Sequence, residues 1–185
     1  MARPKQFSAV KLVCGLIFGR DDPRDDSKQR LEGSFGPIDL VSPCHVFDLT
    51  DYYEEEMGSG LRRMFLSFEH LVRPEDLAGI KLRTNALEEE VRLRFGAERR
   101  VVNLDPGYLT AASLIMATAK DFSHRIPLQN GIYAHLEFLF RKNGIRPLAW
   151  TYPDLTGDRY TEFFLASRRI YLAQLAAAQA SGRTV

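Results

Sequence analysis

A seven-residue stretch in the middle of the chain carries more polar chemistry than a turn requires. It reads NLDPGYL over residues 103–109 and places Asn103, Asp105 and Tyr108 around a Pro-Gly pair. Strand alternation puts Asn103 and Asp105 on one face of the segment before the pair, and the pair itself predicts a turn that the Asp side chain can stabilise. A buried amide needs a partner. Asn103 therefore bonds either a neighbouring loop or a ligand.

A cationic stretch follows after a short segment. It reads KDFSHR over residues 120–125 and contains Lys120, His124 and Arg125. Histidine titrates near neutral pH, and arginine binds carboxylate or phosphate with two donors at once. The two stretches therefore predict opposite walls of one site, in which an acid or a base lies beside a bound anion. The alternative is that both are polar connections between structural elements.

Four polar residues upstream recur at helical spacing. Lys81, Asn85, Glu88 and Arg92 occupy the i, i+4, i+7 and i+11 positions of one helix face. If this face is solvated, the residues form surface ion pairs. If it borders a cleft, Lys81 and Asn85 can hold a phosphate or carboxylate, and Glu88 can act as a base or bind a metal.

Acidic and aromatic residues also mark two predicted strands. Glu54 to Glu56 end the first of them, where paired carboxylates can bind a hard cation such as magnesium. A charged strand edge that resists further pairing is the other interpretation. On the second strand, Tyr133, His135 and Glu137 share a face. We interpret that face as solvated; a pair formed by the histidine and the carboxylate is the alternative.

The pattern of apolar residues predicts the elements that carry these side chains. We expect strands at residues 10–18, 46–55, 61–72, 99–105, 131–140 and 145–150, and helices at residues 27–35, 74–95, 111–118 and 160–180. The second and third strands form a hairpin across Gly58-Ser59-Gly60. For residues 111–118 a strand is the alternative, because the apolar run is short.

These elements predict a single α+β domain over residues 1–185, with an ordered core at about residues 10–178. The sheet is mostly antiparallel, and the order strand, helix, strand, strand, helix, strand gives it a ferredoxin-like start. One long central helix and a C-terminal helix complete the domain. The helical period of the central helix predicts that Leu77, Ile80, Leu87 and Val91 face the sheet while Glu89 and Glu90 face solvent.

Composition argues against several classes of function. Lys+Arg 25 against Asp+Glu 24 gives a formal net charge of +1, which disfavours nucleic acid as a partner. No apolar stretch approaches the roughly 20 residues that span a bilayer, so we expect no membrane insertion. Cys14 and Cys44 lie far apart and are expected to be reduced, buried thiols in a cytoplasmic protein. The sequence contains no P-loop, Rossmann fingerprint, zincin motif or hydrolase nucleophile elbow.

Six ordered motifs carry a family resemblance. They are TDYYEEEMG (50–58), KLRTNALE (81–88), NLDPGYL (103–109), KDFSHR (120–125), GIYA (131–134) and WTYPD (150–154). With them the chain resembles, from about residue 11 to residue 171, a bacterial family catalogued as domain of unknown function 4416. The resemblance implies no established activity, and the GTP-binding label that some members carry has no P-loop here to support it. It gives weight to the polar and aromatic residues of the motifs.

We therefore expect a small cytoplasmic enzyme that binds a phosphorylated metabolite or nucleotide through a Lys/His/Arg cluster with carboxylates nearby. A non-catalytic nucleotide-binding protein, for GTP or another nucleotide without a P-loop, is the alternative, and assembly into a homodimer is a third interpretation. A divalent metal such as magnesium is the cofactor that the carboxylates suit. The candidate catalytic residues are Asp105, His124, Glu56 and Glu88. The candidate ligand-binding residues are Lys81, Asn85, Asn103, Tyr108, Lys120, Arg125, Tyr52, Tyr133, Trp150 and Asp154.

Overall fold

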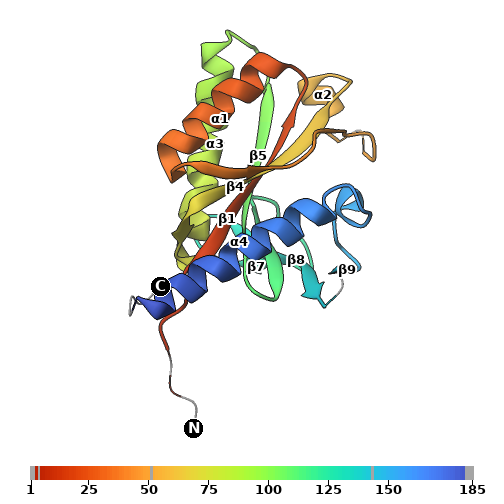
Figure 1. Ribbon diagram of the computed structural model, residues 1–185. Coiled ribbons are helices and arrows are strands. Elements are labelled where there is room, and N and C mark those ends of the chain that lie inside the picture. The colour runs from red at the N-terminus through yellow and green to blue at the C-terminus, as the bar shows by residue number, and fades with distance from the viewer. Residues whose placement is uncertain (1–2, 4, 51, 143, 182–185) are drawn as a thin grey trace.

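One antiparallel sheet runs through the computed structural model, which describes residues 3, 5–50, 52–142 and 144–181 (Figure 1). Within these ranges the sheet has nine strands in the order β2-β4-β1-β5-β6-β8-β7, with β3 paired to β4 and β9 paired to β8. The strands are β1 (Val10–Phe18), β2 (Ile38–Val41), β3 (His45–Val46), β4 (Arg62–Val72), β5 (Val102–Leu109), β6 (Ser113–Thr118), β7 (Ile126–Pro127), β8 (Tyr133–Arg141) and β9 (Gly144–Pro147).

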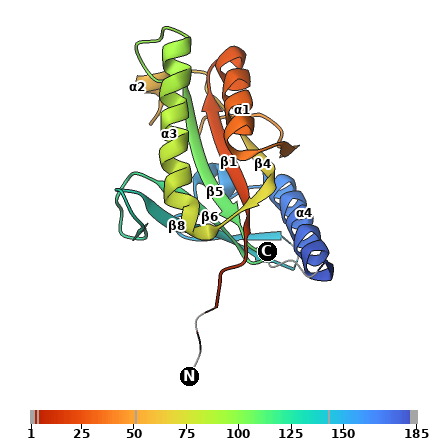
Figure 2. The same cartoon turned by 90° about the vertical axis from the view of Figure 1, so that its left-hand side faces the viewer.

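Helices cover both faces of the sheet. They are α1 (Asp21–Phe35), the single turn α2 (Glu54–Met57), α3 (Leu77–Arg94) and α4 (Thr161–Ala180), with 3₁₀ turns at Pro74–Asp76 and Pro153–Leu155. Figure 2 shows α1 and α3 side by side over β1 and β5, with α4 on the other side of the sheet. No helix in the described residues is long and apolar enough to cross a membrane.

The predicted α+β fold class is confirmed, and so is the ferredoxin-like start. The strands β1, β2, β4 and β5 lie in the spatial order β2-β4-β1-β5, with α1 and α3 as the two crossover helices. All nine residues of β1 are buried, because helices pack on both faces of this central strand.

Two apolar cores follow from this layering. Leu77, Ile80, Leu87 and Val91 of α3 are buried as their spacing predicted; Glu89 is exposed, and Glu90 is partly covered by ion pairs with Arg30 and Arg83. The second core lies under α4, where the rings of Phe65 and Phe138 each lie 5.0 Å from that of Phe164. Edge contacts between rings at this distance add to the hydrophobic gain.

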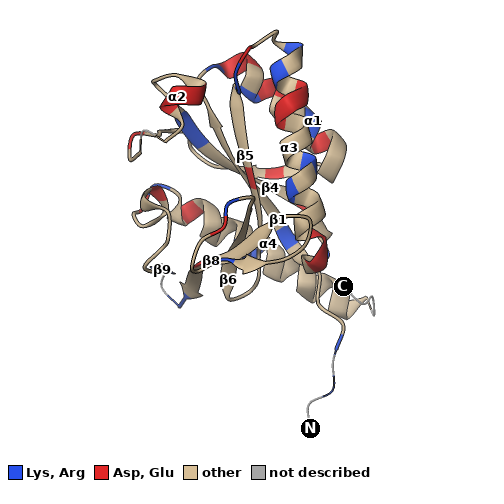
Figure 3. Ribbon diagram, turned by 180° about the vertical axis from the view of Figure 1, so that it is seen from behind, with Lys and Arg blue, Asp and Glu red and all other residues tan. Residues whose placement is uncertain are grey.

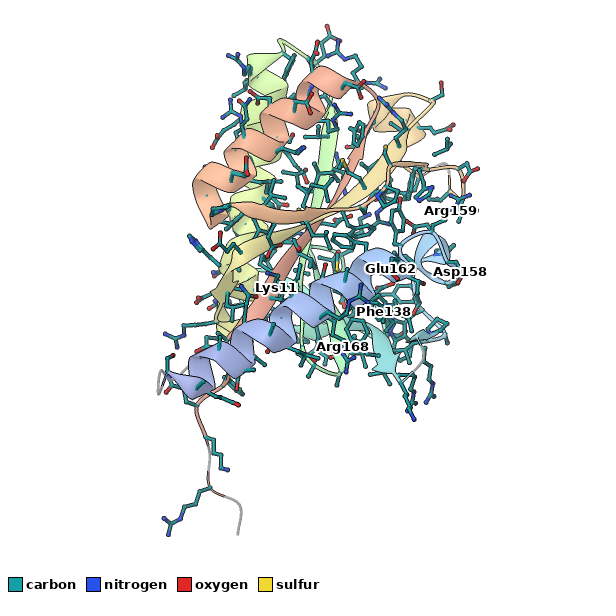
Figure 4. All side chains as sticks on the ribbon, viewed as in Figure 1. Lys11, Phe138, Asp158, Arg159, Glu162 and Arg168 are labelled. Atoms are coloured by element: carbon teal, nitrogen blue, oxygen red, sulfur yellow. The ribbon has the colours of Figure 1, made fainter. Side chains whose placement is uncertain are left out.

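A buried lysine ties the N-terminal strand to the C-terminal helix. The side chain of Lys11 is fully buried, and Figure 4 labels it next to α4. It forms an ion pair with Asp39 and donates to Gln174 Oε1 at 3.1 Å, while Ser67 donates to the second Asp39 oxygen at 2.6 Å. These bonds satisfy a charge that would otherwise be costly to bury.

Charges of both signs cover the outer faces of α1 and α3 (Figure 3). Arg30 bonds Asp26 at 2.6 Å and Glu90 at 2.7 Å, and Arg83 bonds the other Glu90 oxygen at 2.7 Å. Such exposed pairs contribute little individually.

The predicted hairpin of residues 46–55 with residues 61–72 forms over two residue pairs and not over the predicted length. In this part of the chain His45 and Val46 pair with β4, and Glu54 to Glu56 lie in the helical turn α2. Acidic side chains are favourable in the first turn of a helix, and Gly58 ends this turn at a φ of 80°. The predicted helix at 27–35 begins earlier, at Asp21, because Asp21, Asp22 and Pro23 suit a first turn.

The Pro-Gly pair is not a turn. Pro106 and Gly107 lie inside β5, paired with β1, and residues 113–118 form a strand, the alternative left open for that segment. Gly107 is required by close approach, since a Cβ there would overlap the carbonyl oxygen of Ile115 and the sulfur of Met116. Only glycine lets β6 approach β5 at this point.

Two further expectations concern cysteines and strand ends. Cys14 and Cys44 are both free, but Cys44 is exposed and not buried as expected. The last predicted strand is shorter than expected, ending at Pro147.

We expect Gly107→Ala to destabilise the protein by about 1–3 kcal/mol, because the new methyl group has to displace the backbone of β6. Urea denaturation measures this change in the free energy of unfolding. Gly33→Ala is the matched control: Gly33 lies inside α1, and apart from the neighbouring backbone of this helix no atom lies within 4 Å of an added Cβ. This change should therefore stabilise the protein by about 0.5–1 kcal/mol. Equal effects of the two substitutions would contradict the close approach.

Candidate functional site

A cavity of about 690 Å³ opens where two neighbouring strands separate. β6 pairs with β5 at Gly107 to Leu109, so within the described residues the first half of β5 has β1 on one side and no strand on the other. Most of the cavity wall comes from residues 47–50, residues 52–53, α3, β5, residues 118–125 and residues 152–154. Segments from across the chain therefore meet at this gap in the sheet.

Side chains of α3 replace the missing strand. Glu88 Oε1 accepts from the backbone N–H of Leu104 at 2.7 Å, and Lys81 Nζ donates to the carbonyl oxygen of the same residue at 2.7 Å. Lys81 and Glu88 are both buried. The face of α3 that carries Lys81, Asn85 and Glu88 thus borders a cavity, and the interpretation as a solvated face is wrong for these three residues.

A chain of hydrogen bonds continues from Lys81 through β5. Lys81 Nζ lies 3.5 Å from Asp105 Oδ1, and Asn103 Nδ2 donates to Asp105 Oδ2 at 2.7 Å. Arg100 donates to Asn103 Oδ1 at 2.9 Å and forms ion pairs with Glu88 and Glu56. Asn103 therefore bonds its neighbours on both sides, and it holds Asp105 in place.

Arg63 on β4 is the most deeply buried cation of the cavity, with 3 % of its surface exposed. Its Nη1 donates to both oxygens of Asp154, at 3.0 and 2.9 Å, and its Nη2 lies 4.0 Å from Asp105 Oδ2. Burial alone would lower the pKa of Arg63, but the charges of Asp154 and then Asp105 offset it and raise the pKa. Nε and Nη2 have no hydrogen-bond partner among the described residues.

Gly15 on β1 makes room for this guanidinium. A Cβ at Gly15 would lie 3.3 Å from Arg63 Nη2 and 2.9 Å from a ring carbon of Phe65. Gly15 also lies opposite Asp105 in the pairing of β1 with β5. The absence of a side chain here lets Arg63 and Asp105 approach each other across the central strand. We call the region of Arg63, Lys81 and Asp105 the inner end of the cavity.

The mouth of the cavity is formed by Tyr52, Lys120 and Arg125. Lys120 Nζ lies 3.6 Å from the ring centroid of Tyr52, a cation–π contact that joins residues 47–53 to residues 118–125. Arg125 Nη1 donates to the carbonyl oxygen of Lys120 at 2.8 Å, and its Nε has no partner among the described residues. Neither cation has a carboxylate within ion-pair distance in the described part of the chain.

The two predicted walls meet only in part. Of the candidate residues, nine line the cavity: Asp105, Glu88, Lys81, Asn85, Asn103, Lys120, Arg125, Tyr52 and Asp154. Five do not line it: His124, Glu56, Tyr108, Tyr133 and Trp150. The Lys/His/Arg cluster therefore contributes its Lys and its Arg to the wall, but not its His.

The residues outside the wall have other contacts. His124 stacks on Trp150 with ring centroids 5.1 Å apart, and burial, followed by His135 and Arg125, lowers its pKa. Trp150 donates its indole N–H to the carbonyl oxygen of Leu136 at 2.7 Å. Tyr108 lines a separate pocket beside the N-terminal segment and α4.

The interpretation of the Tyr133, His135 and Glu137 face as solvated is wrong. His135 and Glu137 are fully buried, with His135 Nε2 2.6 Å from Glu137 Oε2. The other Glu137 oxygen accepts from the backbone N–H of Tyr152 at 2.6 Å. This pair therefore positions the segment that carries Tyr152 and Asp154 to the cavity.

Sequence reasoning missed two charged cavity residues, namely Arg63 and Arg100. Arg63 had one usable signal: it is followed by an apolar run, Met64 to Leu66, on a strand buried on both faces, where a guanidinium has to be paired. Arg100 stands among charged residues and gave no such signal.

The described residues contain no group of three or more His, Cys, Asp or Glu side chains arranged to hold a metal ion. Glu54 to Glu56 do not pair their carboxylates on a strand face, since they belong to α2.

A family model described as "Domain of unknown function (DUF4416)" matches residues 8–171. Comparison with curated proteins and with solved structures gave no match.

We expect the pH dependence of stability to report on Glu88. Burial raises the pKa of Glu88, although Lys81, the N–H of Leu104 and Arg100 oppose the shift. A carboxyl group whose pKa is higher in the folded than in the unfolded state contributes most stability at low pH, and this contribution is lost as the pH rises through the folded pKa. The difference in unfolding free energy, parent minus Glu88→Gln, should therefore fall as the pH rises from about 4 toward neutrality.

Urea denaturation over this pH range measures the difference. Glu89→Gln is the control, because bonding to Arg92 lowers the pKa of Glu89 and its difference should rise with pH. A difference for Glu88→Gln that also rises would contradict the assignment.

Proposed function

The chain belongs to the family described as domain of unknown function DUF4416, and from the geometry of its cavity we propose that it is a small enzyme acting on a phosphorylated metabolite or nucleotide. The observation that carries this proposal is the charge at the mouth. Among the five cations that line the cavity, Lys120 and Arg125 are the two without a carboxylate partner in the described residues.

The mouth is suited to a phosphate group. Arg125 is held by its bond to the Lys120 carbonyl oxygen, and its Nε is buried without a hydrogen-bond partner among the described residues. Lys120 rests on the ring of Tyr52, an interaction that leaves its charge unneutralised. A phosphate that accepts from Arg125 and Lys120 gains charge-assisted hydrogen bonds, which are roughly twice as strong as neutral ones.

Asp105 is the carboxylate best placed to act as a base. Both oxygens of Glu88 are already bonded, one to the N–H of Leu104 and the other to Arg100. Glu56 is paired with Arg100 and lies outside the wall. Asp105 accepts one short bond from Asn103 and faces the cavity between Lys81 and Arg63. A carboxylate fixed in this way can take a proton from a bound substrate.

The size of the cavity supports a small ligand. A volume of about 690 Å³ lies within the range of roughly 300–1,000 Å³ typical of metabolite and cofactor sites. Non-catalytic binding of the same ligand would use the same mouth and would differ only in the role of Asp105.

We expect Arg125→Ala to remove most of the thermal stabilisation that the best-binding phosphate compound gives. A ligand that binds only the folded state at about 100 times its Kd stabilises by about 2.7 kcal/mol. The measurement is the shift in melting temperature with inorganic phosphate, sugar phosphates and nucleotides. Arg146→Ala, an exposed arginine on β9 that does not line the cavity, should keep the full shift. A ligand shift unchanged in Arg125→Ala would refute the phosphate site.

Asp105→Asn should leave binding nearly intact and abolish turnover, because the amide keeps the shape of the side chain and cannot accept a proton as a base. Calorimetry of the ligand found in the screen measures binding, and chromatography of the incubated ligand measures turnover. If Asp105→Asn turns the ligand over as fast as the parent, Asp105 is not the base. If the parent itself shows no turnover, the non-catalytic alternative holds.

A further inference from the structure

The inner end of the cavity has a recognition element of its own in the guanidinium of Arg63. We propose that it binds the planar, uncharged ring of a nucleotide whose phosphate lies at the mouth. This inference rests on the proposed phosphate site and deepens it, because it selects nucleotides among phosphorylated compounds and fixes their orientation.

Arg63 has two donors without partners. Asp154 uses only Nη1, with both of its oxygens. The remaining nitrogens, Nε and Nη2, lie on one edge of the planar guanidinium; both are buried, and neither has a hydrogen-bond partner among the described residues. Leaving buried donors without partners has a cost in free energy. Two neighbouring acceptors on a ligand recover this cost, and an arginine edge binds such pairs bidentately on ring edges as well as on carboxylates.

The charges at the inner end favour an uncharged group over a second anion. Arg63 and Lys81 are balanced there by Asp154 and Asp105. An anion on the free edge of Arg63 would approach Asp105, whose Oδ2 lies 4.0 Å from Nη2. Like charges in such proximity repel each other more strongly in a protein interior than in bulk water. A neutral ring avoids this repulsion, and the carboxylate of Asp105 can accept from a ring N–H.

The aromatic walls favour a flat group. The rings of Phe47 and Tyr152 both line the cavity, and their centroids lie 5.7 and 5.6 Å from the Arg63 guanidinium carbon. A planar ligand that meets the free edge of Arg63 comes within reach of these ring faces, where stacking is favourable for any nucleobase. A sugar phosphate has no ring of this kind to offer.

The test compares dissociation constants on the full chain. The ligands are ribose 5-phosphate, 3-phosphoglycerate and the 5′-monophosphates of adenosine, guanosine, cytidine and uridine. We expect at least one nucleotide to bind about tenfold or more tightly than ribose 5-phosphate, since one recovered pair of hydrogen bonds exceeds 1.4 kcal/mol. We expect 3-phosphoglycerate, with its second anionic group, to gain nothing over ribose 5-phosphate.

Arg63→Lys provides the second arm. It keeps the charge beside Asp154 but removes the planar edge, so the advantage of the nucleotide should disappear while the affinity for ribose 5-phosphate stays. Arg62→Lys is the matched control, since the neighbouring Arg62 pairs with Asp21 outside the cavity. If Arg63→Lys does not fold, the ligand series on the parent decides alone.

Two results would overturn the inference while leaving the phosphate site intact: ribose 5-phosphate binding as tightly as every nucleotide, or 3-phosphoglycerate binding more tightly than ribose 5-phosphate. A nucleotide advantage that survives in folded Arg63→Lys would also overturn it. If none of the phosphate compounds binds, the phosphate site itself fails, and the inference fails with it.

Discussion

The unpaired edge of β5 is the constraint on which the site depends. β6 pairs with β5 at three residues, Gly107 to Leu109, and this pairing does not reach Leu104. Without other partners, the N–H and C=O of Leu104 would therefore be buried without hydrogen bonds. Each unsatisfied group would cost roughly 1–3 kcal/mol. Glu88 and Lys81 supply the missing acceptor and donor from α3. A backbone requirement therefore brings two charged side chains into the interior.

Those two charges require further charges in turn. Lys81 lies beside Asp105, Glu88 beside Arg100, and Arg100 bonds Glu56 at the surface. Buried ions are tolerated when they are paired and their remaining hydrogen-bonding groups are satisfied. Every cation of this interior network has an acidic partner, and Lys120 and Arg125 at the mouth differ from it in having none among the described residues. The charges are thus balanced at the inner end of the cavity, while the mouth is positive. This difference follows from the separation of β6 from β5.

Local periodicity was enough to predict part of this arrangement. The helical spacing of Lys81, Asn85 and Glu88, and the strand alternation of Asn103 and Asp105, placed these side chains together correctly because both patterns depend only on backbone geometry. Local periodicity could not show whether this face of α3 borders water or a cavity, because the answer depends on where the pairing of β5 with β6 ends. Arg63 was missed for a related reason: its partners, Asp154 and Asp105, are distant in sequence, and only the fold brings them to β4.

The Pro-Gly pair in residues 103–109 is also explained by contacts between segments that are distant in sequence. Local turn chemistry accounts for Pro106 and Gly107 so well that a strand through them is hard to foresee. The backbone N–H and C=O of Leu104 point toward α3, and by strand alternation the backbone nitrogen of Pro106 points to the same side of β5. The pairing of β5 with β6 starts one residue later, at Gly107. The N–H that proline lacks is therefore not needed for a hydrogen bond between strands. Gly107 then admits the backbone of β6 at close range. Pro106 is thus the last residue of β5 before the pairing with β6, and Gly107 is the first residue within that pairing. The Pro-Gly pair therefore lies at the point where β5 and β6 separate and the cavity begins.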